Sequence, residues 1–376
     1  MKKAIILILI LLMSFGLTTY AEDSQPVLDE VPGKIDYKWA VNQYSKREDI
    51  RLMEMSIEMS LPNLEETLED YKERTDPVWG ASTPAMRANN MVLMKYAIAE
   101  QEERIESLKN SVQEHLDQQV IGIRNSLRSV YASQKNVSFS ERSLRMSKTT
   151  LDSAEYYYRN GIGTLSTVKN ARYNYLAEQV ALEDAKIALE NSLMSFNRTI
   201  GMDLLTVYKE IDIDETLIIN NTNNIKLLAD KKYESLIKAK EYEIEKEQYR
   251  KESLESFFSI YPNSKEHIFE ELEVIEERIA DLNDDLILIK ITQRRHYNER
   301  AQAMIDSFDS IDDTKENITE QKKDYNKLYS QYLDQDVGYA SLEQSRLNIE
   351  KAEDNLKQQI YNFNTSYMSY LLEMEI

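Results

Sequence analysis

The sequence contains no cysteine and very little glycine or proline. Its 376 residues include 8 Gly and 6 Pro, and only one proline, Pro262, follows Pro84. Without cysteine the chain can form neither disulfides nor thiolate metal sites, and it has no thiol nucleophile. Glycine and proline supply the turns that β-sandwiches, barrel enzymes and nucleotide-binding α/β folds need in large numbers. The scarcity of both therefore argues against these classes and favours a protein of very long helices.

The balance of charge argues against another class of partner. The chain carries 46 Lys and Arg against 66 Asp and Glu, which gives a formal net charge of −20. Because binding to nucleic acid requires clustered basic side chains that displace counterions from phosphates, we expect no nucleic acid partner. Aromatic residues are few, at 9%, but apolar residues make up 42% of the chain, which is enough for a folded protein.

The N-terminus has the composition of a secretory signal peptide. Lys2 and Lys3 precede an apolar run of 14 residues, and small residues up to Ala21 form a cleavage site. The alternative, an uncleaved anchor helix, is disfavoured because about 20 apolar residues are needed to span a bilayer. We therefore predict a signal peptide at residues 1–21, a linker at 22–35 and export to the cell envelope, either the outer membrane or a periplasm-like space.

Apolar residues recur at every seventh position in two parts of the chain, which is the pattern of a coiled coil. The first part carries Leu116, Ile123, Val130, Val137, Leu144, Leu151 and Tyr158, and then Val168, Tyr175, Leu182, Leu189 and Phe196. The same phase returns 174 residues later with Tyr297, Met304, Ile311, Ile318, Tyr325 and Tyr332, and then Leu342, Ile349, Leu356, Phe363 and Tyr370. This agreement indicates an internal duplication.

We therefore predict an all-α fold of two tandem helical repeats, residues 36–210 and 211–376. Each repeat has a preceding helix, at about 36–72 or 224–256, followed by a long hairpin that reverses near 159–164 or 334–338. The first long helix is expected to begin at Thr83-Pro84, and Ser166 or Thr167 to cap the first returning helix. The alternating residues at 210–214 predict a short strand or extended connector. A single hairpin cannot cover its ladders, so we expect partners from the other repeat or from other chains.

No motif of catalysis or metal binding is present. His115, His267 and His296 lack the spacing of zinc or di-iron ligands, and the sequence has no phosphate-binding glycine loop and no serine nucleophile elbow. Runs of acidic residues lack the spacing of a calcium loop, and we interpret them as solvated helix faces. We predict no enzyme activity, no cofactor and no metal.

The first reversal and the helix after it resemble the TolC-type efflux proteins. The segment YRNGIGTLSTVKNAR, residues 158–172, is similar to that family's hairpin tip, where a glycine turn leads into a hydroxyl or acidic residue, Val, a polar pair and Ala-Arg. A looser match runs from Val337 to Arg346. The resemblance implies a homotrimer whose six hairpins close into a hollow α-helical tube, or α-barrel. This tube would dock onto a periplasmic adaptor, itself bound to an inner-membrane pump.

One feature departs from that family, whose members insert membrane β-strands after the first helix of each repeat. Alternating segments of about 10 residues with aromatic girdles, the mark of such strands, follow neither Pro77 nor Pro262. The only strand-like piece, Leu286–Ile291, is too short and uniform. We therefore expect little or no β-barrel, which argues against insertion in an outer membrane but leaves the tube and the adaptor contacts in place.

The two reversals are the best candidates for functional sites. Gly161 and Gly163 are expected to adopt backbone conformations that a β-carbon forbids. In the simpler interpretation, the glycines only allow the chain to reverse. In the functional interpretation, an exposed element at the end of the tube docks onto the adaptor, and acidic side chains at the tube mouth favour cations. The predicted docking residues are Gly161, Ile162, Gly163, Thr164, Val337 and Gly338, and the mouth residues are Asp334 and Asp336.

The sequence thus predicts a passive conduit of a tripartite efflux or type I secretion system. One alternative is an extracytoplasmic coiled-coil scaffold without a transport lumen, and another is an enzyme built on a helical bundle. Two separate apolar seams on one helix would favour a tube, and a single seam would favour a solid rod. The heptad ladders alone do not decide between the two.

Overall fold

The computed structural model describes residues 34–73, 83–213, 216–219, 221–257, 260, 265–334 and 337–374. Residues Lys34–Ile376 form one compact unit. The predicted signal peptide and most of the predicted linker lie outside the described residues. No helix in the described part of the chain is both long enough and apolar enough to cross a membrane.

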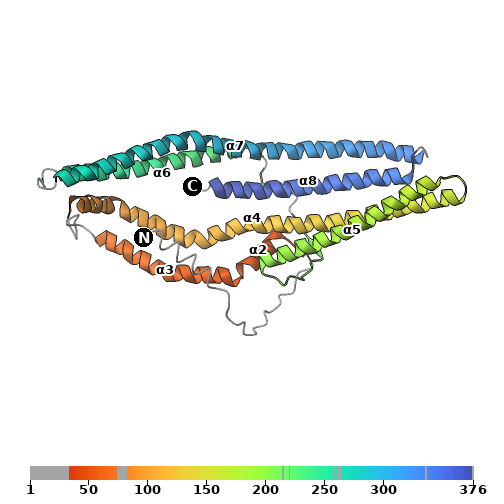
Figure 1. Cartoon of the computed structure of the whole chain (residues 1–376), viewed down its shortest axis with the longest axis horizontal. Helices are drawn as coiled ribbons and strands as arrows, with labels where there is room; N and C mark the ends of the chain where they lie inside the picture. The colour runs from red at the N-terminus through yellow and green to blue at the C-terminus, as the bar shows by residue number, and fades with distance from the viewer. Residues whose placement is uncertain are drawn as a thin grey trace, which may run out of the picture. The chain divides into compact units, whose positions relative to one another are not determined.

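Long helices make up nearly all of the described chain, which confirms the predicted all-α class (Figure 1). In order they are α2 (Tyr37–Ser45), α3 (Glu48–Glu73), α4 (Pro84–Arg159), α5 (Leu165–Ile200), α6 (Asn223–Ser256), α7 (Lys265–Leu333) and α8 (Tyr339–Met374). With 76 residues, α4 is about 110 Å long at 1.5 Å per residue. A helix, a much longer helix and a helix of 36 residues follow one another twice, as α3–α4–α5 and α6–α7–α8.

The single helix expected over residues 36–72 is wrong, because the chain bends between α2 and α3. The first helix ends at Ser45 and the second begins at Glu48. Between them, Arg47 donates from Nη1 to the backbone carbonyl of Thr199, near the end of α5, at 2.8 Å. This tie to a distant part of the chain fixes the bend, and no local sequence signal announces it.

The ends of α4 and α5 follow the residues that the sequence places there. Thr83 Oγ1 accepts a hydrogen bond from the Met86 backbone N–H at 3.2 Å, and Pro84, which has no N–H to leave unsatisfied, begins α4 as expected. Gly201 ends α5 with a φ of +75°, the left-handed conformation that favours glycine after a helix.

Extended structure is confined, among the described residues, to two short strands. The strand β1 (Lys34–Ile35) pairs in parallel with β2 (Glu210–Ile211), so that Lys34 lies opposite Glu210. The predicted connector at 210–214 therefore contains a strand of two residues, whose partner comes from the predicted linker. The strand-like segment Leu286–Ile291 is helical and lies within α7.

Two buried asparagines hold the connector between the repeats. Asn197 in α5 donates to two connector carbonyls, at 3.1 and 2.8 Å, and accepts from the Tyr208 hydroxyl at 2.6 Å. Burial raises the pKa of Tyr208, which keeps its hydroxyl protonated as a donor. Asn364 in α8 donates to the Thr216 carbonyl at 2.7 Å and accepts from the Ile218 N–H at 3.1 Å. Both asparagines are 0% exposed, so their loss would leave buried backbone groups unsatisfied.

The heptad positions are the places where the helices pack. The buried rungs include Ile123, Val130, Leu151, Val168, Leu182, Phe196, Tyr297, Met304, Ile311, Ile318, Leu342, Ile349, Phe363 and Tyr370. They pack between the helices of one hairpin and between the repeats, since α4 contacts both α5 and α8. The ladders are therefore covered largely within one chain and do not by themselves require further chains.

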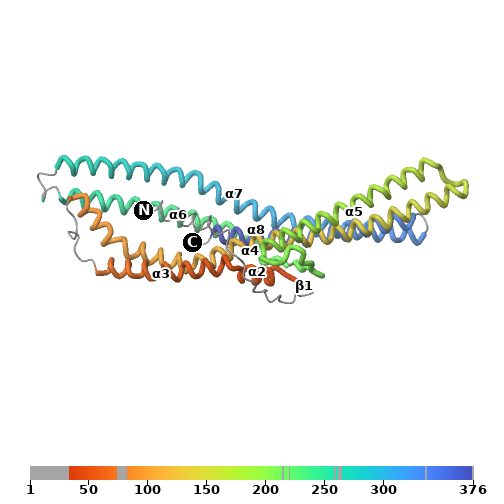
Figure 2. The backbone as a smooth tube through the Cα atoms, turned by 60° about the horizontal axis from the view of Figure 1, so that its bottom comes forward, coloured from red at the N-terminus to blue at the C-terminus, as the bar shows by residue number. Residues whose placement is uncertain are grey.

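The helices lie in a row in which distant parts of the sequence are neighbours (Figures 1 and 2). In the half away from the reversals the order is α3, α4, α6 and α7, because α4 contacts α3 and α6, and α6 contacts α7. In the half near the reversals the order is α5, α4, α8 and α7. One edge of the row is thus formed by α3 and α5, and the other by α7.

Candidate docking tips and an uncovered helix face

The first reversal is closed by main-chain hydrogen bonds. The backbone N–H groups of Gly161, Ile162 and Gly163 donate to the carbonyls of Tyr158 and Tyr157 at distances of 2.9 to 3.0 Å. Gly161 has a φ of +75°, as expected for a glycine that ends a helix. The last carbonyls of α4 are therefore satisfied by the turn itself, which holds Ile162 at the extreme end of the hairpin.

Gly163 is needed for a different reason from the one that the sequence suggested. Its φ does not lie in the left-handed region, unlike that of Gly161. A β-carbon at this position would lie 3.1 Å from the backbone nitrogen of Tyr158 and 3.3 Å from the carbonyl carbon of Tyr157. The expectation of a forbidden conformation is correct for Gly161 and wrong for Gly163, where glycine permits a close approach of two backbone segments.

The cap of α5 is Thr164, and the expected caps Ser166 and Thr167 lie inside the helix. The Thr164 hydroxyl oxygen accepts a hydrogen bond from the Thr167 backbone N–H at 3.2 Å, and its own backbone is extended, with φ −104° and ψ 153°. Thr164 therefore has a structural role at the tip, and its side chain remains exposed beside the turn.

Glu155 joins the two helices behind the turn. Its carboxylate accepts hydrogen bonds from Arg159 of α4 at 3.2 Å and from Arg172 of α5 at 2.8 Å. Arg172 is the arginine of the Ala-Arg pair in the tip motif, so the motif contains one half of a bond that clamps the hairpin. The sequence pattern alone did not reveal its acidic partner.

The outer surface of the first tip is apolar and exposed. Ile162 is 74% exposed, and Leu165 is 48% exposed in the first turn of α5. Three consecutive tyrosines at the end of α4 add large exposed rings, namely Tyr156, Tyr157 and Tyr158. Apolar side chains held outward on a hydrogen-bonded turn suit contact with another protein.

The second reversal is built with fewer constraints. Gly338 accepts a hydrogen bond from the Ser341 N–H at 3.1 Å, its φ is not left-handed, and a β-carbon there would meet nothing within 4 Å. Asp334 is exposed and Val337 is half-buried. Asp336 lies outside the described residues, so only one of the two predicted mouth carboxylates is placed.

Both reversals lie at the same end of the row, on the right in Figures 1 and 2. Near this end the first turns of α8, including Ser341, line a cavity of about 670 Å³ together with Ser147 of α4 and Ala171 of α5. Since Gly161 follows Ser147 by 14 residues, the first tip extends about 20 Å beyond the second at 1.5 Å per residue. The predicted tip residues therefore form two groups at different levels.

A second apolar stripe on α5 was missed by the heptad analysis. At 100° per residue it lies nearly opposite the packed ladder of the same helix. It consists of Tyr173, Leu176, Val180 and Ile187, whose exposed fractions are 74%, 54%, 61% and 56%. We call these four residues the α5 stripe. The helix thus carries two apolar seams, and the structure covers only one of them.

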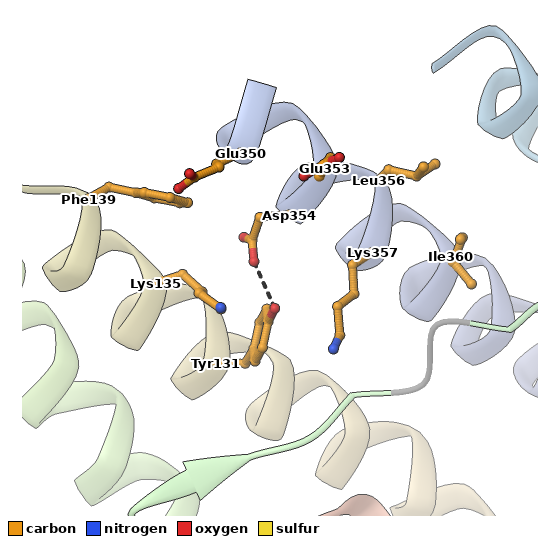
Figure 3. A pocket seen from close by; sticks show the side chains of 9 residues that line it. All are labelled: Tyr131, Lys135, Phe139, Glu350, Glu353, Asp354, Leu356, Lys357 and Ile360. Carbon is orange, nitrogen blue, oxygen red and sulfur yellow. Dashed lines mark hydrogen bonds between the residues drawn. The ribbon is translucent and has the colours of Figure 1, made fainter. Parts of the chain in front are cut away.

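The equivalent face of α8 is covered, and the internal repeat shows the correspondence. The positions 174 residues after the α5 stripe are Leu347, Glu350, Asp354 and Tyr361. This face packs on α4, where the Tyr131 hydroxyl donates to Asp354 at 2.7 Å (Figure 3) and Arg142 binds both Glu350 and Glu343. Carrying the repeat offset to the positions between the rungs would have revealed the α5 stripe from the sequence.

A cavity of about 490 Å³ lies beside the Tyr131–Asp354 bond, between α4 and α8 (Figure 3). Lys135 and Lys357 face it together with the carboxylates of Glu350, Glu353 and Asp354. Positive and negative groups thus share its lining, so that its field selects no ion of one sign. No group of three or more side chains suited to hold a metal ion occurs in the described residues. We interpret the cavity as part of the contact between the two repeats.

Comparison with known proteins supports the fold and goes no further. The sequence matches no protein-family model and no curated protein. The structure is similar to those of the outer-membrane channel OprN (TM-score 0.54, 10% identity, covering 90% of this chain and 89% of that one) and of CusC, described for its transmembrane channel formation (0.55, 10%, 95% and 98%). It is also similar to the outer membrane channel CmeC of Campylobacter jejuni (0.53, 10%, 90% and 85%). The predicted resemblance to TolC-type channels is therefore confirmed for the fold.

Proposed function

We propose that this chain is an exported tunnel component of a tripartite efflux or type I secretion system. In this proposal three copies form a hollow tube that conducts substrate passively, and the chain catalyses nothing. The hairpin tips dock on a periplasmic adaptor, and an inner-membrane pump provides energy and direction.

The observation that carries the proposal is the uncovered α5 stripe. Within the chain, α8 uses the equivalent face to pack on α4 of the other repeat. Since α7 is the counterpart of α4, the same contact between two chains would bring α5 of one copy onto α7 of the next. A head-to-tail contact of this kind joins different surfaces, and it forms a ring when its rotation closes. Helical hairpins arranged in such a ring enclose a central bore.

The geometry of the tips supports a docking role. The first tip extends about 20 Å beyond the second, so its exposed Ile162 would meet a partner first. The main-chain hydrogen bonds of the turn and the Glu155 clamp hold this residue in place before a partner binds. Preorganisation of this kind lowers the entropy lost on binding.

Mass and shape in solution test the proposal and separate it from the scaffold alternative. Light scattering on the mature chain should give the mass of three copies, and electron microscopy of the same sample should show a hollow cylinder. A monomer, or a dimeric rod without a bore, would support a coiled-coil scaffold and contradict the conduit.

Docking is tested separately with the adaptor encoded in the same genome. Ile162→Asp should weaken binding of that adaptor by at least about tenfold while the trimer persists, because a charge replaces an apolar contact. Leu205→Asp is the matched control, since Leu205 is 77% exposed and lies in the connector away from the tips. Equal adaptor affinity in the two variants would refute the role of Ile162.

A further inference from the structure

The half of the row away from the reversals has an uncovered apolar stripe on one edge. On α3, Leu52, Met55 and Met59 are 57%, 55% and 71% exposed. They follow one another at intervals of three and four residues, which places them on one face of the helix. Ile50, Ile57 and Leu64 turn the opposite face toward α4. We call the exposed residues the α3 stripe, and they point away from the rest of the row.

The opposite edge of the same half carries a similar stripe on α7. Ile287, Leu288 and Ile291 are 57%, 59% and 67% exposed and are called here the α7 stripe. They belong to the segment Leu286–Ile291, which is strand-like in sequence but helical in the structure. Leu286 is buried and faces the interior of the row. The remaining aliphatic side chains of the segment thus have no packing role that the fold explains.

The two stripes lie at the same level along the helices. Three ion pairs connect α7 to α6, α6 to α4 and α4 to α3, namely Lys240–Asp285, Lys246–Glu100 and Lys109–Glu65. Counting residues from pair to pair places Ile291 within about two helical turns of the level of Met59. Rotation about an axis along the helices leaves this level unchanged, so a ring of copies brings the two edges face to face.

The charges beside the stripes are complementary. Helix α3 contains nine acidic and two basic residues. By contrast, α7 from Lys290 to Arg300 contains four basic residues and only one acidic residue, Glu299, in a chain whose net charge is −20. Contact between α3 and α7 would therefore be attractive, whereas contact between two copies of α3 would be repulsive.

The contact between α6 and α4 within the chain provides a template. Tyr96 of α4 packs edge-on against Tyr242 and Tyr249 of α6, with ring centroids 5.4 and 5.9 Å apart. Each of α3 and α6 precedes the long helix of its own set. A contact of α3 with α7 of the next copy is thus the counterpart of the contact between α6 and α4.

We propose that the α3 stripe of one copy packs against the α7 stripe of the next copy and closes the ring in the half away from the reversals. This inference rests on the proposed assembly of several chains and adds a second contact to the one at the α5 stripe. The partner is a second copy of this chain, bound head to tail.

Cross-linking tests the contact cleanly because the native chain has no cysteine. The full mature chain carrying both Met59→Cys and Ile291→Cys is treated with a short bismaleimide reagent and separated on a denaturing gel. Covalent dimers and trimers are expected. Each single variant should remain monomeric, because a head-to-tail contact joins two different edges. Leu205→Cys combined with Ile291→Cys is the control and should also remain monomeric.

The other outcomes each contradict a defined statement. A trimer by light scattering that gives no cross-linked product would overturn this contact and leave the proposed function standing. A monomer in solution would overturn both. Cross-linking of Met59→Cys alone would show a contact between like edges, and a bridge within a single chain, detected by mass spectrometry, would show that one copy covers its own stripes. Either result refutes the head-to-tail contact.

A charge placed on the stripe distinguishes a second copy from a lipid surface. Met59→Asp should weaken assembly at least tenfold without loss of helicity, whereas Leu205→Asp should not. If Met59→Asp leaves the assembly intact and instead abolishes co-flotation with phosphatidylcholine–phosphatidylglycerol vesicles, the stripe binds lipid and the proposal is wrong.

Discussion

The three glycines at the reversals should respond differently to alanine. At Gly163 a β-carbon would lie 3.1 Å from the Tyr158 nitrogen and 3.3 Å from two atoms of Tyr157, and the α4 backbone prevents all three from moving away. Such overpacking costs about 1–3 kcal/mol. At Gly161 the β-carbon has open space, but a φ of +75° costs an alanine about 1–2 kcal/mol. Neither cost applies at Gly338, where alanine should stabilise the fold by about 0.4–1 kcal/mol by restricting the unfolded chain.

Hydrogen exchange measures these changes where they occur, because a hairpin tip opens locally before the whole chain unfolds. Gly163→Ala should speed exchange in a peptide covering residues 156–168 by about 5- to 100-fold, since 1.4 kcal/mol corresponds to a factor of ten. Gly161→Ala should speed exchange in this peptide by about 5- to 30-fold. Gly338→Ala should leave exchange in a peptide covering 337–345 equal or slower. Faster exchange at Gly338→Ala, or none at Gly163→Ala, would refute the steric reasoning.

The same variants connect the tip geometry to docking. Gly161→Ala combined with Gly163→Ala should displace Ile162 and weaken adaptor binding, whereas Gly338→Ala should bind as the native chain does. If the double variant opens the tip by hydrogen exchange but binds the adaptor with unchanged affinity, the first tip has no docking role.

Three further predictions follow from burial. Val180→Asp, in the exposed α5 stripe, should change the free energy of unfolding by about 0.5 kcal/mol or less but lower the sedimenting mass to that of one chain; a retained trimer would contradict the proposed contact. Phe196→Ala, at a site 0% exposed, should lower the free energy of unfolding in urea by about 3–5 kcal/mol, and Tyr173→Ala, at 74% exposed, by about 0.5 kcal/mol or less; equal losses would refute the orientation of α5. Burial raises the pKa of Tyr370 from 10.0 to about 12, so its stabilisation is full below pH 10 and is lost as the pH rises toward 12. Tyr370→Phe should therefore show a shallower fall of the unfolding free energy over this range, and an unchanged slope would contradict the shift.

Local signals in the sequence were sufficient for the helices and their ends. The heptad ladders identified the packed faces of α4, α5, α7 and α8, because a period of seven keeps one side of a helix apolar. Thr83 and Pro84 marked the start of α4, and the glycine turn marked the first tip. The tip motif also led to the correct fold, which the structural comparisons confirm.

Features that depend on contacts between distant segments could not be read in the same way. The bend after Ser45 exists because Arg47 binds the Thr199 carbonyl, and the requirement for Gly163 arises from how closely the turn approaches α4. Glu155 acquires its role only when the hairpin brings Arg172 beside it.

The sequence by itself determined the class, the length and the paired order of the helices, since these follow from the identities of residues within a few turns of one another. Only the tertiary structure decided which apolar faces are already covered. A stripe such as Tyr173–Ile187 is as apolar as a packed one, and its exposure depends on whether a helix from the other repeat lies against it. The faces left uncovered, and therefore the surfaces available to partners, are a property of the assembled helices.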